Sequence, residues 1–208
     1  MEQIQAALQQ GKVKLVKELV QQALDSGKTA ADIMDNGLLA AMNVVGEKFK
    51  LGQAFIPEVL IAARALNGGM EVLKPVLVAD DVKPKGKAVL GTVKGDLHDI
   101  GKNIVKIMFE SKGIEVIDLG VDVPPEKFIA EAIDKNADII ACSALLTTTM
   151  SVMKDVVDCA VKAGIREKVC IMVGGAPITE KFCESVGADV YTADAATASD
   201  WAAKYLQQ

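Results

Sequence analysis

The chain contains a single histidine, His98, so any chemistry that needs an imidazole must use this residue. His98 lies in the pattern Asp96-x-His98-x-x-Gly101, which follows a short apolar run. A carboxylate two residues before a loop histidine can hold one ring N–H, so that the other ring nitrogen faces outward as a metal ligand. The pattern therefore predicts His98 as a metal ligand oriented by Asp96. The alternative is an ordinary surface loop residue beside a helix N-cap at Asp99.

Two glycines and a lysine near this loop also suggest phosphate binding. A P-loop requires G-x-x-x-x-G-K-[ST], but Asp96 stands at the position of its first glycine. Asn103 replaces the hydroxyl residue that would contact magnesium. The dinucleotide pattern G-x-G-x-x-G does not occur here either. The sequence thus excludes both phosphate-binding motifs at this loop.

Two further motifs follow later apolar runs of strand length. Ser143-Ala144-Leu145 begins after 41 intervening residues from Gly101, and Gly174-Gly175 begins after 28 intervening residues from Leu145. In a parallel sheet, ligands bind at the carboxyl ends of the strands, near the point where the strand order reverses. We therefore expect the three motifs to meet at one edge of a sheet.

From Lys87 onward, apolar runs alternate with helical patterns, which predicts an α/β fold with a five-stranded parallel sheet covered on both faces. The expected strands are residues 88–93, 115–119, 138–143, 169–173 and 189–192. The expected helices are residues 102–112, 125–135, 149–163, 179–186 and 195–206.

The first 80 residues have a different pattern, with apolar side chains at three- and four-residue steps. This pattern predicts a bundle of about four helices, of which the third begins near residue 29 and ends near Lys50. Pro57 fits the first turn of the last helix. Residues 81–87 are charged, contain Pro and Gly, and show no periodicity, so they are expected to be a linker. The expected domains are a helical domain over 1–80 and an α/β domain over 88–208.

The composition excludes several classes of protein. Half of the 208 residues are apolar and 25% are charged, as in a folded globular protein. The net charge of -5 argues against a nucleic-acid surface built on positive charge. No apolar run reaches the roughly 18 residues of a membrane span, and the first residues lack a signal-peptide pattern, so we expect a cytoplasmic protein with no membrane partner. The four cysteines form no C-x-x-C pair and are expected to be buried apolar side chains.

Taken together, the D-x-H-x-x-G, S-x-L and G-G motifs at these spacings resemble the cobalamin-binding domain of corrinoid proteins, which has a flavodoxin-like, Rossmann-like fold. The segments Met42-Asn43-Val44-Val45-Gly46 and Pro57-Glu58-Val59-Leu60 are similar to the helical cap that accompanies this domain in methyl carriers. The resemblance covers nearly the whole chain. It is to the corrinoid proteins of methyltransferase systems for methanol, methylamines, glycine betaine or methoxylated aromatics, and to the cobalamin module of methionine synthase.

This resemblance implies a cofactor site. His98 would be the lower ligand of the cobalt in cobalamin or a related corrinoid, and Asp96 its hydrogen-bonding partner. The nucleotide tail of the cofactor would enter a slot that only small side chains leave open. The other residues implied in the site are Asp99, Gly101, Ser143, Leu145, Thr147, Thr148, Gly174 and Gly175, with Phe55 and Leu60 of the cap over the upper face of the cobalt. Ser143, Thr147 and Thr148 also have a simpler explanation, since Ser and Thr often occur in loops and begin helices.

By the same resemblance, the protein carries a methyl group and is not a complete enzyme. Its partners would be a substrate-specific methyltransferase, a second methyltransferase acting on tetrahydrofolate or a thiol coenzyme, and a reductive activator. The cap would swing aside about the linker. Two alternatives stay open: the cobalamin-binding subunit of an adenosylcobalamin-dependent mutase, and a flavodoxin-like module for another nucleotide. A cobalamin-dependent regulator is disfavoured because the N-terminal segment lacks a basic recognition helix.

Overall fold

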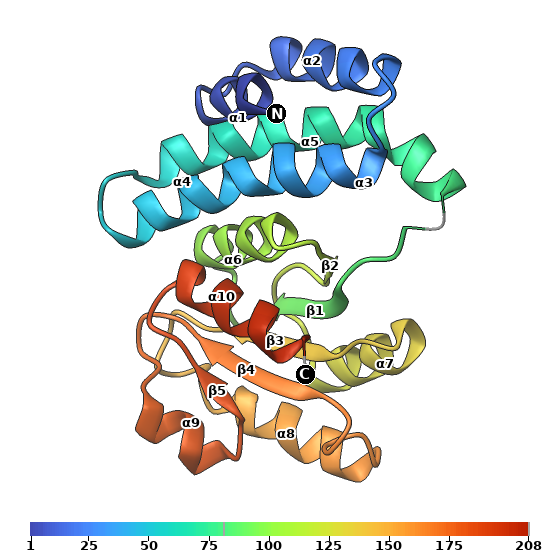
Figure 1. Ribbon diagram of the computed structural model, residues 1–208. Coiled ribbons are helices and arrows are strands. Elements are labelled where there is room, and N and C mark those ends of the chain that lie inside the picture. The colour runs from blue at the N-terminus through green and yellow to red at the C-terminus, as the bar shows by residue number, and fades with distance from the viewer. Residues whose placement is uncertain (81, 208) are drawn as a thin grey trace. The chain divides into compact units, whose positions relative to one another are not determined.

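The computed structural model describes residues 1–80 and 82–207, and the chain divides into two compact units (Figure 1). The helical unit comprises Met1–Pro84 with the short segment Ser111–Gly113. The α/β unit comprises Lys85–Glu110 and Ile114–Gln208. Asp81, the first residue of the expected linker, and Gln208 lie outside the described residues.

Four helical runs build the helical unit. They are α1 (Glu2–Gln9), α2 (Val13–Asp25), a continuous run of α3 (Ala30–Ile33), η1 (Met34–Leu39) and α4 (Ala40–Lys50), and α5 (Ile56–Ala79). The middle part of the third run, η1, is π-helical, which the sequence pattern does not predict. The apolar stripes of these helices form a core with the fully buried side chains Leu8, Val16, Val20, Ile33, Leu38, Met42 and Leu73. No described helix is long and apolar enough to cross a membrane.

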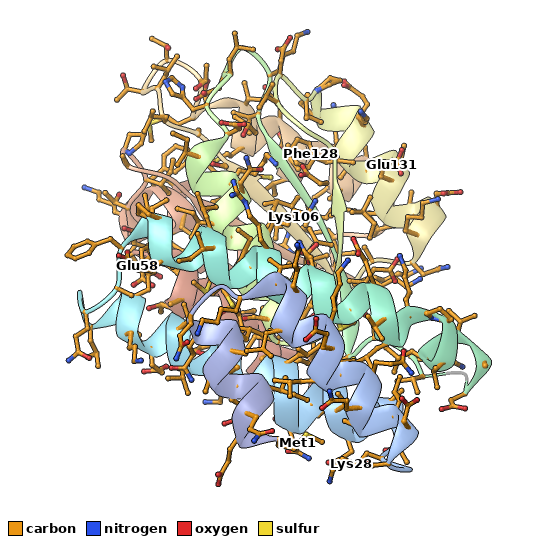
Figure 2. All side chains as sticks on the ribbon, turned by 90° about the horizontal axis from the view of Figure 1, so that it is seen from above. Met1, Lys28, Glu58, Lys106, Phe128 and Glu131 are labelled. Atoms are coloured by element: carbon orange, nitrogen blue, oxygen red, sulfur yellow. The ribbon has the colours of Figure 1, made fainter. Side chains whose placement is uncertain are left out.

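Local contacts fix the start and the packing of α5. The carboxylate of Glu58, labelled in Figure 2, accepts the backbone N–H of Phe55 at 2.9 Å, and Pro57 lies in the first turn as expected. Further along, a Cβ at Gly69 would lie 2.7 Å from Leu38 of η1. A side chain at this position would force Leu38 to move, so glycine suits the close packing of α5 against η1.

The α/β unit contains a five-stranded parallel sheet in the order β2-β1-β3-β4-β5. The strands are β1 (Gly86–Thr92), β2 (Ile114–Asp118), β3 (Ile139–Ser143), β4 (Cys170–Gly174) and β5 (Val190–Tyr191). β1 begins at Gly86, so the last two residues of the expected linker belong to the sheet. The register pairs Thr92 with Ser143 and Ser143 with Gly174, so the three central strands end side by side. The strand order reverses between β1 and β3, where ligands bind in such sheets.

Helices cover both faces of this sheet (Figure 1). They are α6 (Ile100–Ser111), α7 (Pro125–Lys135), α8 (Val152–Lys162), α9 (Glu180–Val186) and α10 (Ala195–Tyr205). One core contains Phe128 of α7 and Met153 of α8, and the core on the other face contains Phe109 of α6 and Ala202 of α10. The expected α/β architecture with a helical N-terminal part is confirmed. The expected helix over 149–163 spans Val152–Lys162, because residues 145–149 form a turn that hydrogen-bonds to Asp96.

Candidate functional site

The buried carboxylate of Asp96 is the centre of a hydrogen-bond cluster at the carboxyl end of β1. Its side chain is 0% exposed. Oδ1 accepts the His98 Nδ1–H at 2.8 Å and the His98 backbone N–H at 3.1 Å. Oδ2 accepts the backbone N–H groups of Leu145 at 2.8 Å and Leu146 at 3.1 Å, and the Thr149 hydroxyl at 2.9 Å. Both oxygens of this buried group are thus fully hydrogen-bonded, which lets it remain charged without water.

The charge of Asp96 determines which nitrogen of His98 carries the hydrogen. Burial alone raises the pKa of the Asp96 carboxyl, but the hydrogen bonds from Leu145, from the side chain and backbone of His98, and from Leu146 together outweigh it. The pKa therefore lies well below its ordinary value. An ionised carboxylate only accepts hydrogen bonds, so Nδ1 is the donor and Nε2 keeps a free lone pair. Because the His98 side chain is 52% exposed, Nε2 belongs to an imidazole that is fixed on one side and open on the other.

Thr149 is a member of this cluster that the sequence reasoning missed. The sequence pattern predicts that residue 149 begins a helix, and the family resemblance implies Thr147 and Thr148 in the site. The structure buries Thr149 to 8% exposure, whereas Thr147 and Thr148 are exposed in the same turn. Three consecutive threonines give no signal of which one will face Asp96, because this depends on how the turn after β3 folds.

The two glycines of the G-G motif lie in different surroundings. A Cβ at Gly175 would lie only 1.8 Å from the carbonyl oxygen of Ala144, and its φ of +132 is a conformation that favours glycine. A Cβ at Gly174 would meet nothing within 4 Å, and the same is true at Gly101 in the first turn of α6. Packing within the protein therefore requires Gly175, whereas Gly101 and Gly174 border open space. Ser143, at the end of β3, is the strand partner of Gly174 and continues this row of small residues.

Asp99 and Leu145 both make hydrogen bonds within the protein. The Asp99 carboxylate accepts a hydrogen bond from the Asn103 side chain at 3.2 Å, one turn further along α6, and it does not join the Asp96 cluster. Leu145 contributes its backbone N–H to that cluster, and its side chain is 43% exposed.

Phe55 and Leu60 belong to the helical unit, at the start of α5. Phe55 is 65% exposed and Leu60 is 37% exposed, and the neighbouring Ile56 and Ile61 are also exposed. The first turns of α5 therefore present an apolar surface. Their role in covering a cofactor stays a prediction.

A single imidazole fits a metal whose other ligands come from a macrocyclic cofactor. Among the described residues, no group of three or more His, Cys, Asp and Glu side chains could hold a metal ion. One imidazole can nevertheless be the single protein ligand of a cobalt whose equatorial nitrogens belong to a corrin ring. The apolar neighbours of His98 in the chain, Leu97 and Ile100, are 71% and 66% exposed, and Leu146 is 41% exposed. Exposed apolar side chains around an open imidazole suit a large, flat, mostly apolar ligand.

Comparisons with known proteins agree with this geometry. Models described as "B12 binding domain" match residues 86–200 and residues 1–74. Dimethylamine corrinoid protein 1 of Methanosarcina mazei is 41% identical over 95% of this chain and 93% of its own length. A corrinoid protein of Desulfitobacterium hafniense is 38% identical over 99% of this chain and 97% of its own length.

Solved structures give the same result. The methanol:cobalamin methyltransferase complex of Methanosarcina barkeri contains a chain that is 33% identical, with a TM-score of 0.88, over 99% of this chain and 78% of that one. A cobalamin-binding protein of Desulfitobacterium hafniense is 32% identical, with a TM-score of 0.79, over 97% of this chain and 96% of that one. The chain therefore belongs to the B12-binding domain family, among the corrinoid proteins.

Proposed function

We propose that this protein is the methyl carrier of a methyltransferase system and that Nε2 of His98 is the lower axial ligand of its corrinoid cobalt. When bound, the corrinoid supplies a cobalt that accepts a methyl group from one partner enzyme and releases it to another. The observation that carries the proposal is the His98 imidazole, which Asp96 holds at Nδ1 and which is open at Nε2.

In this proposal the Asp96 cluster orients the ligand and fixes which ring nitrogen of His98 carries the hydrogen. A carboxylate at Nδ1 makes the opposite nitrogen a better electron donor, as it does at many metal-bound imidazoles. The N–H groups of Leu145 and Leu146 and the hydroxyl of Thr149 keep the carboxylate in place against His98.

The remaining site residues have simpler proposed roles. The open space at Gly101 and Gly174 supports a slot for the nucleotide tail of the cofactor, bordered by Ser143 and closed behind by Gly175. The proposed slot and its rim also include Asp99, Leu145, Thr147 and Thr148. Phe55 and Leu60 would shield the upper face of the cobalt, and the described part of the expected linker that precedes β1, residues 82–85, would let the helical domain move aside.

The partner is a methyltransferase, as in the methanol:cobalamin methyltransferase complex. Because several relatives are named dimethylamine or trimethylamine corrinoid proteins, we propose an enzyme that demethylates an amine as the first donor to test, and a methanol enzyme as the second. A second methyltransferase acting on tetrahydrofolate or a thiol coenzyme and a reductive activator complete the proposed system, in the cytoplasm. The names of these relatives do not favour an adenosylcobalamin-dependent mutase.

The presence of only one histidine allows an unambiguous test of the cobalt ligand. The full chain is grown with ¹⁵N-histidine, loaded with cobalamin and reduced to cobalt(II). An axial ¹⁴N splits each EPR line into three, whereas an axial ¹⁵N splits it into two, and we call the twofold splitting the His98 coupling. We expect the His98 coupling in labelled wild-type protein and its loss in His98→Ala.

A threefold splitting in the ¹⁵N-labelled protein would assign the axial nitrogen to the cofactor's own base and would refute this ligand assignment. The function is tested separately by mixing cobalamin-loaded protein with candidate amine methyltransferases. Transfer of the methyl group from the amine to the carrier is expected with wild type and is expected to be strongly reduced with His98→Ala.

A further inference from the structure

We infer that Thr92 and Asp122 are positioning residues that hold the His98 loop, residues 93–99, in the conformation that presents Nε2 to the metal. Neither residue belongs to the D-x-H-x-x-G, S-x-L or G-G motif. The inference rests on the proposed role of His98 as the cobalt ligand. Thr92 and Asp122 hold the backbone of the loop, whose conformation Asp96 alone does not fix.

Thr92 connects the backbone of His98 directly to the sheet. It is the last residue of β1, it is 0% exposed, and its hydroxyl donates a hydrogen bond to the His98 carbonyl oxygen at 2.8 Å. The His98 backbone N–H is already bonded to Asp96. With both bonds formed, the donor and the acceptor of the His98 peptide backbone are fixed from two sides. The direction of the imidazole then follows from a fixed Cα and not from the Asp96 contact alone.

Asp122 holds the first half of the same loop from the connection between β2 and α7. Its Oδ1 accepts the backbone N–H of Gly95 at 2.7 Å, and its own N–H donates to the Asp96 carbonyl oxygen at 3.0 Å. Asp122 has a φ of 54, and among the described residues only Asn136 shares this left-handed conformation without being glycine. This conformation is unfavourable for a residue with a Cβ, so the two bonds to the loop are formed against a local cost.

The backbone around Asp122 is itself tied to β1, which makes it a firm support. Val123 donates its N–H to the Thr92 carbonyl oxygen at 3.0 Å, and Thr92 donates its N–H to the Gly120 carbonyl oxygen at 3.0 Å. These bonds continue the parallel ladder beyond the end of β2. Thr92 is therefore bonded both to the connection that carries Asp122 and to His98, and the two positioning residues form one support.

Paired variants separate these hydrogen bonds from other effects of substitution. Thr92→Val keeps the branched shape and removes the hydroxyl, whereas Thr92→Ser keeps the hydroxyl. Asp122→Gly relieves the left-handed φ and removes the carboxylate, whereas Asp122→Asn keeps an acceptor and tolerates that φ. Ser199→Ala is the matched control, because it removes a buried hydroxyl that donates to a backbone carbonyl, that of Ala196 in α10.

The test measures how easily an external ligand replaces His98. Unlabelled imidazole is added to the full chain carrying ¹⁵N-histidine and cobalt(II) cobalamin, and the concentration that removes half of the His98 coupling is recorded. We expect this concentration to fall about fivefold in Thr92→Val and about threefold in the more exposed Asp122→Gly, as the loss of one hydrogen bond implies. Thr92→Ser, Asp122→Asn and Ser199→Ala should stay close to wild type.

The outcomes distinguish this inference from the proposed function. If wild type shows no His98 coupling, the ligand assignment fails, and the inference with it. If wild type shows the coupling but Thr92→Val and Asp122→Gly keep the wild-type half-displacing concentration, only the positioning role is wrong. A shift of equal size in Ser199→Ala would also overturn it, because the effect would then be general destabilisation. Should Thr92→Val fail to fold, the comparison of Asp122→Gly with Asp122→Asn decides.

Discussion

Carboxylates accept backbone N–H groups at both ends of the parallel sheet, and at the carboxyl end the Asp96 carboxylate also holds an imidazole with a free ring nitrogen. At the amino end, Asp138 accepts the N–H of Lys87 at 2.8 Å, and Asp189 accepts the N–H of Ile171 at 2.7 Å. At the carboxyl end, Asp96 accepts the N–H groups of Leu145 and Leu146. Asp138 and Asp189 thus join their loops to a neighbouring strand, whereas Asp96 joins its loop to the turn that follows β3.

Asp189 and Asp96 differ in the partner of the second carboxylate oxygen. The second oxygen of Asp189 accepts a hydrogen bond from Arg166 at 2.6 Å, and a guanidinium group has no lone pair with which to bind a metal. The second oxygen of Asp96 binds His98, whose Nε2 is left with a lone pair. A carboxylate bonded to the backbone is therefore not by itself a sign of function. What indicates a binding site is a side chain such as His98, which is held at Nδ1 and has a free lone pair at Nε2.

The largest effect is expected for Asp96→Ala. This substitution leaves the N–H groups of Leu145 and Leu146 and the hydroxyl of Thr149 without their acceptor. We expect it to destabilise the protein by about 3–5 kcal/mol and to abolish the His98 coupling. Urea unfolding of the cofactor-free protein and EPR of the loaded protein measure the two effects. Wild-type stability in this variant would contradict a structural role for the cluster.

The pH dependence of stability tests whether ionised Asp96 stabilises the folded state. Because the fold lowers the pKa of Asp96, its ionised form stabilises the folded state above the ordinary pKa of a carboxyl group. This stabilisation is lost as the pH falls through that ordinary value toward the lowered one. The unfolding free energy of wild type relative to Asp96→Asn should therefore shrink below about pH 4. A difference that grows on acidification would show that the sign is wrong.

Gly175→Ala is expected to have the next largest effect. The added Cβ would overlap the carbonyl oxygen of Ala144, in a backbone conformation that disfavours alanine. We expect a loss of about 3 kcal/mol of unfolding free energy, because the Ser143-Ala144-Leu145 segment must move. Thermal or urea unfolding of the cofactor-free protein measures it. An unchanged midpoint would mean that this turn adapts freely.

Asp189→Ala tests the other end of the sheet with the same substitution as Asp96→Ala. It removes the acceptor for Ile171 and the partner of Arg166. The expected cost is about 1–3 kcal/mol of unfolding free energy. The His98 coupling should remain as in wild type. Its loss in Asp189→Ala would remove the distinction between the two ends, because destabilisation alone would then be enough to release His98.

The smallest effect on stability is expected for Gly174→Ala, the direct contrast to its neighbour Gly175. Its Cβ would enter open space, so the unfolding free energy should change by less than about 0.5 kcal/mol. If the cofactor tail fills this space, cobalamin binding should weaken about tenfold or more. Equilibrium titration with cobalamin measures this change. Unchanged affinity would place the tail elsewhere.

Several features of the site follow from the sequence because they depend on residues close together in the chain. Asp96 and His98 are two positions apart, so their contact needs only a loop after a strand. The alternation of short apolar runs and helical patterns predicts a parallel sheet, and a parallel sheet places the ends of its strands at one edge. The start of α5 at Ile56 is likewise local, because Pro57 and an acidic residue, Glu58, mark its first turn.

Other features depend on contacts between residues far apart in the chain. Thr149 lies 53 positions from Asp96, and only the fold of the turn after β3 brings it, and not Thr147 or Thr148, to the carboxylate. The register of β1, β3 and β4 decides that Thr92, Ser143 and Gly174 end level with one another.

The same limit applies to the glycines and to Asp122. Gly174 and Gly175 are identical in the sequence, and only the position of the Ala144 carbonyl oxygen makes one of them a packing requirement and leaves the other beside open space. The bond from Gly95 to Asp122 joins two connections that leave different strands. The sequence by itself determined the contact between Asp96 and His98 and the type of sheet, since these follow from local spacing and periodicity. The tertiary structure decided which distant groups support them, because strand register and turn geometry arise only when the whole sheet is assembled.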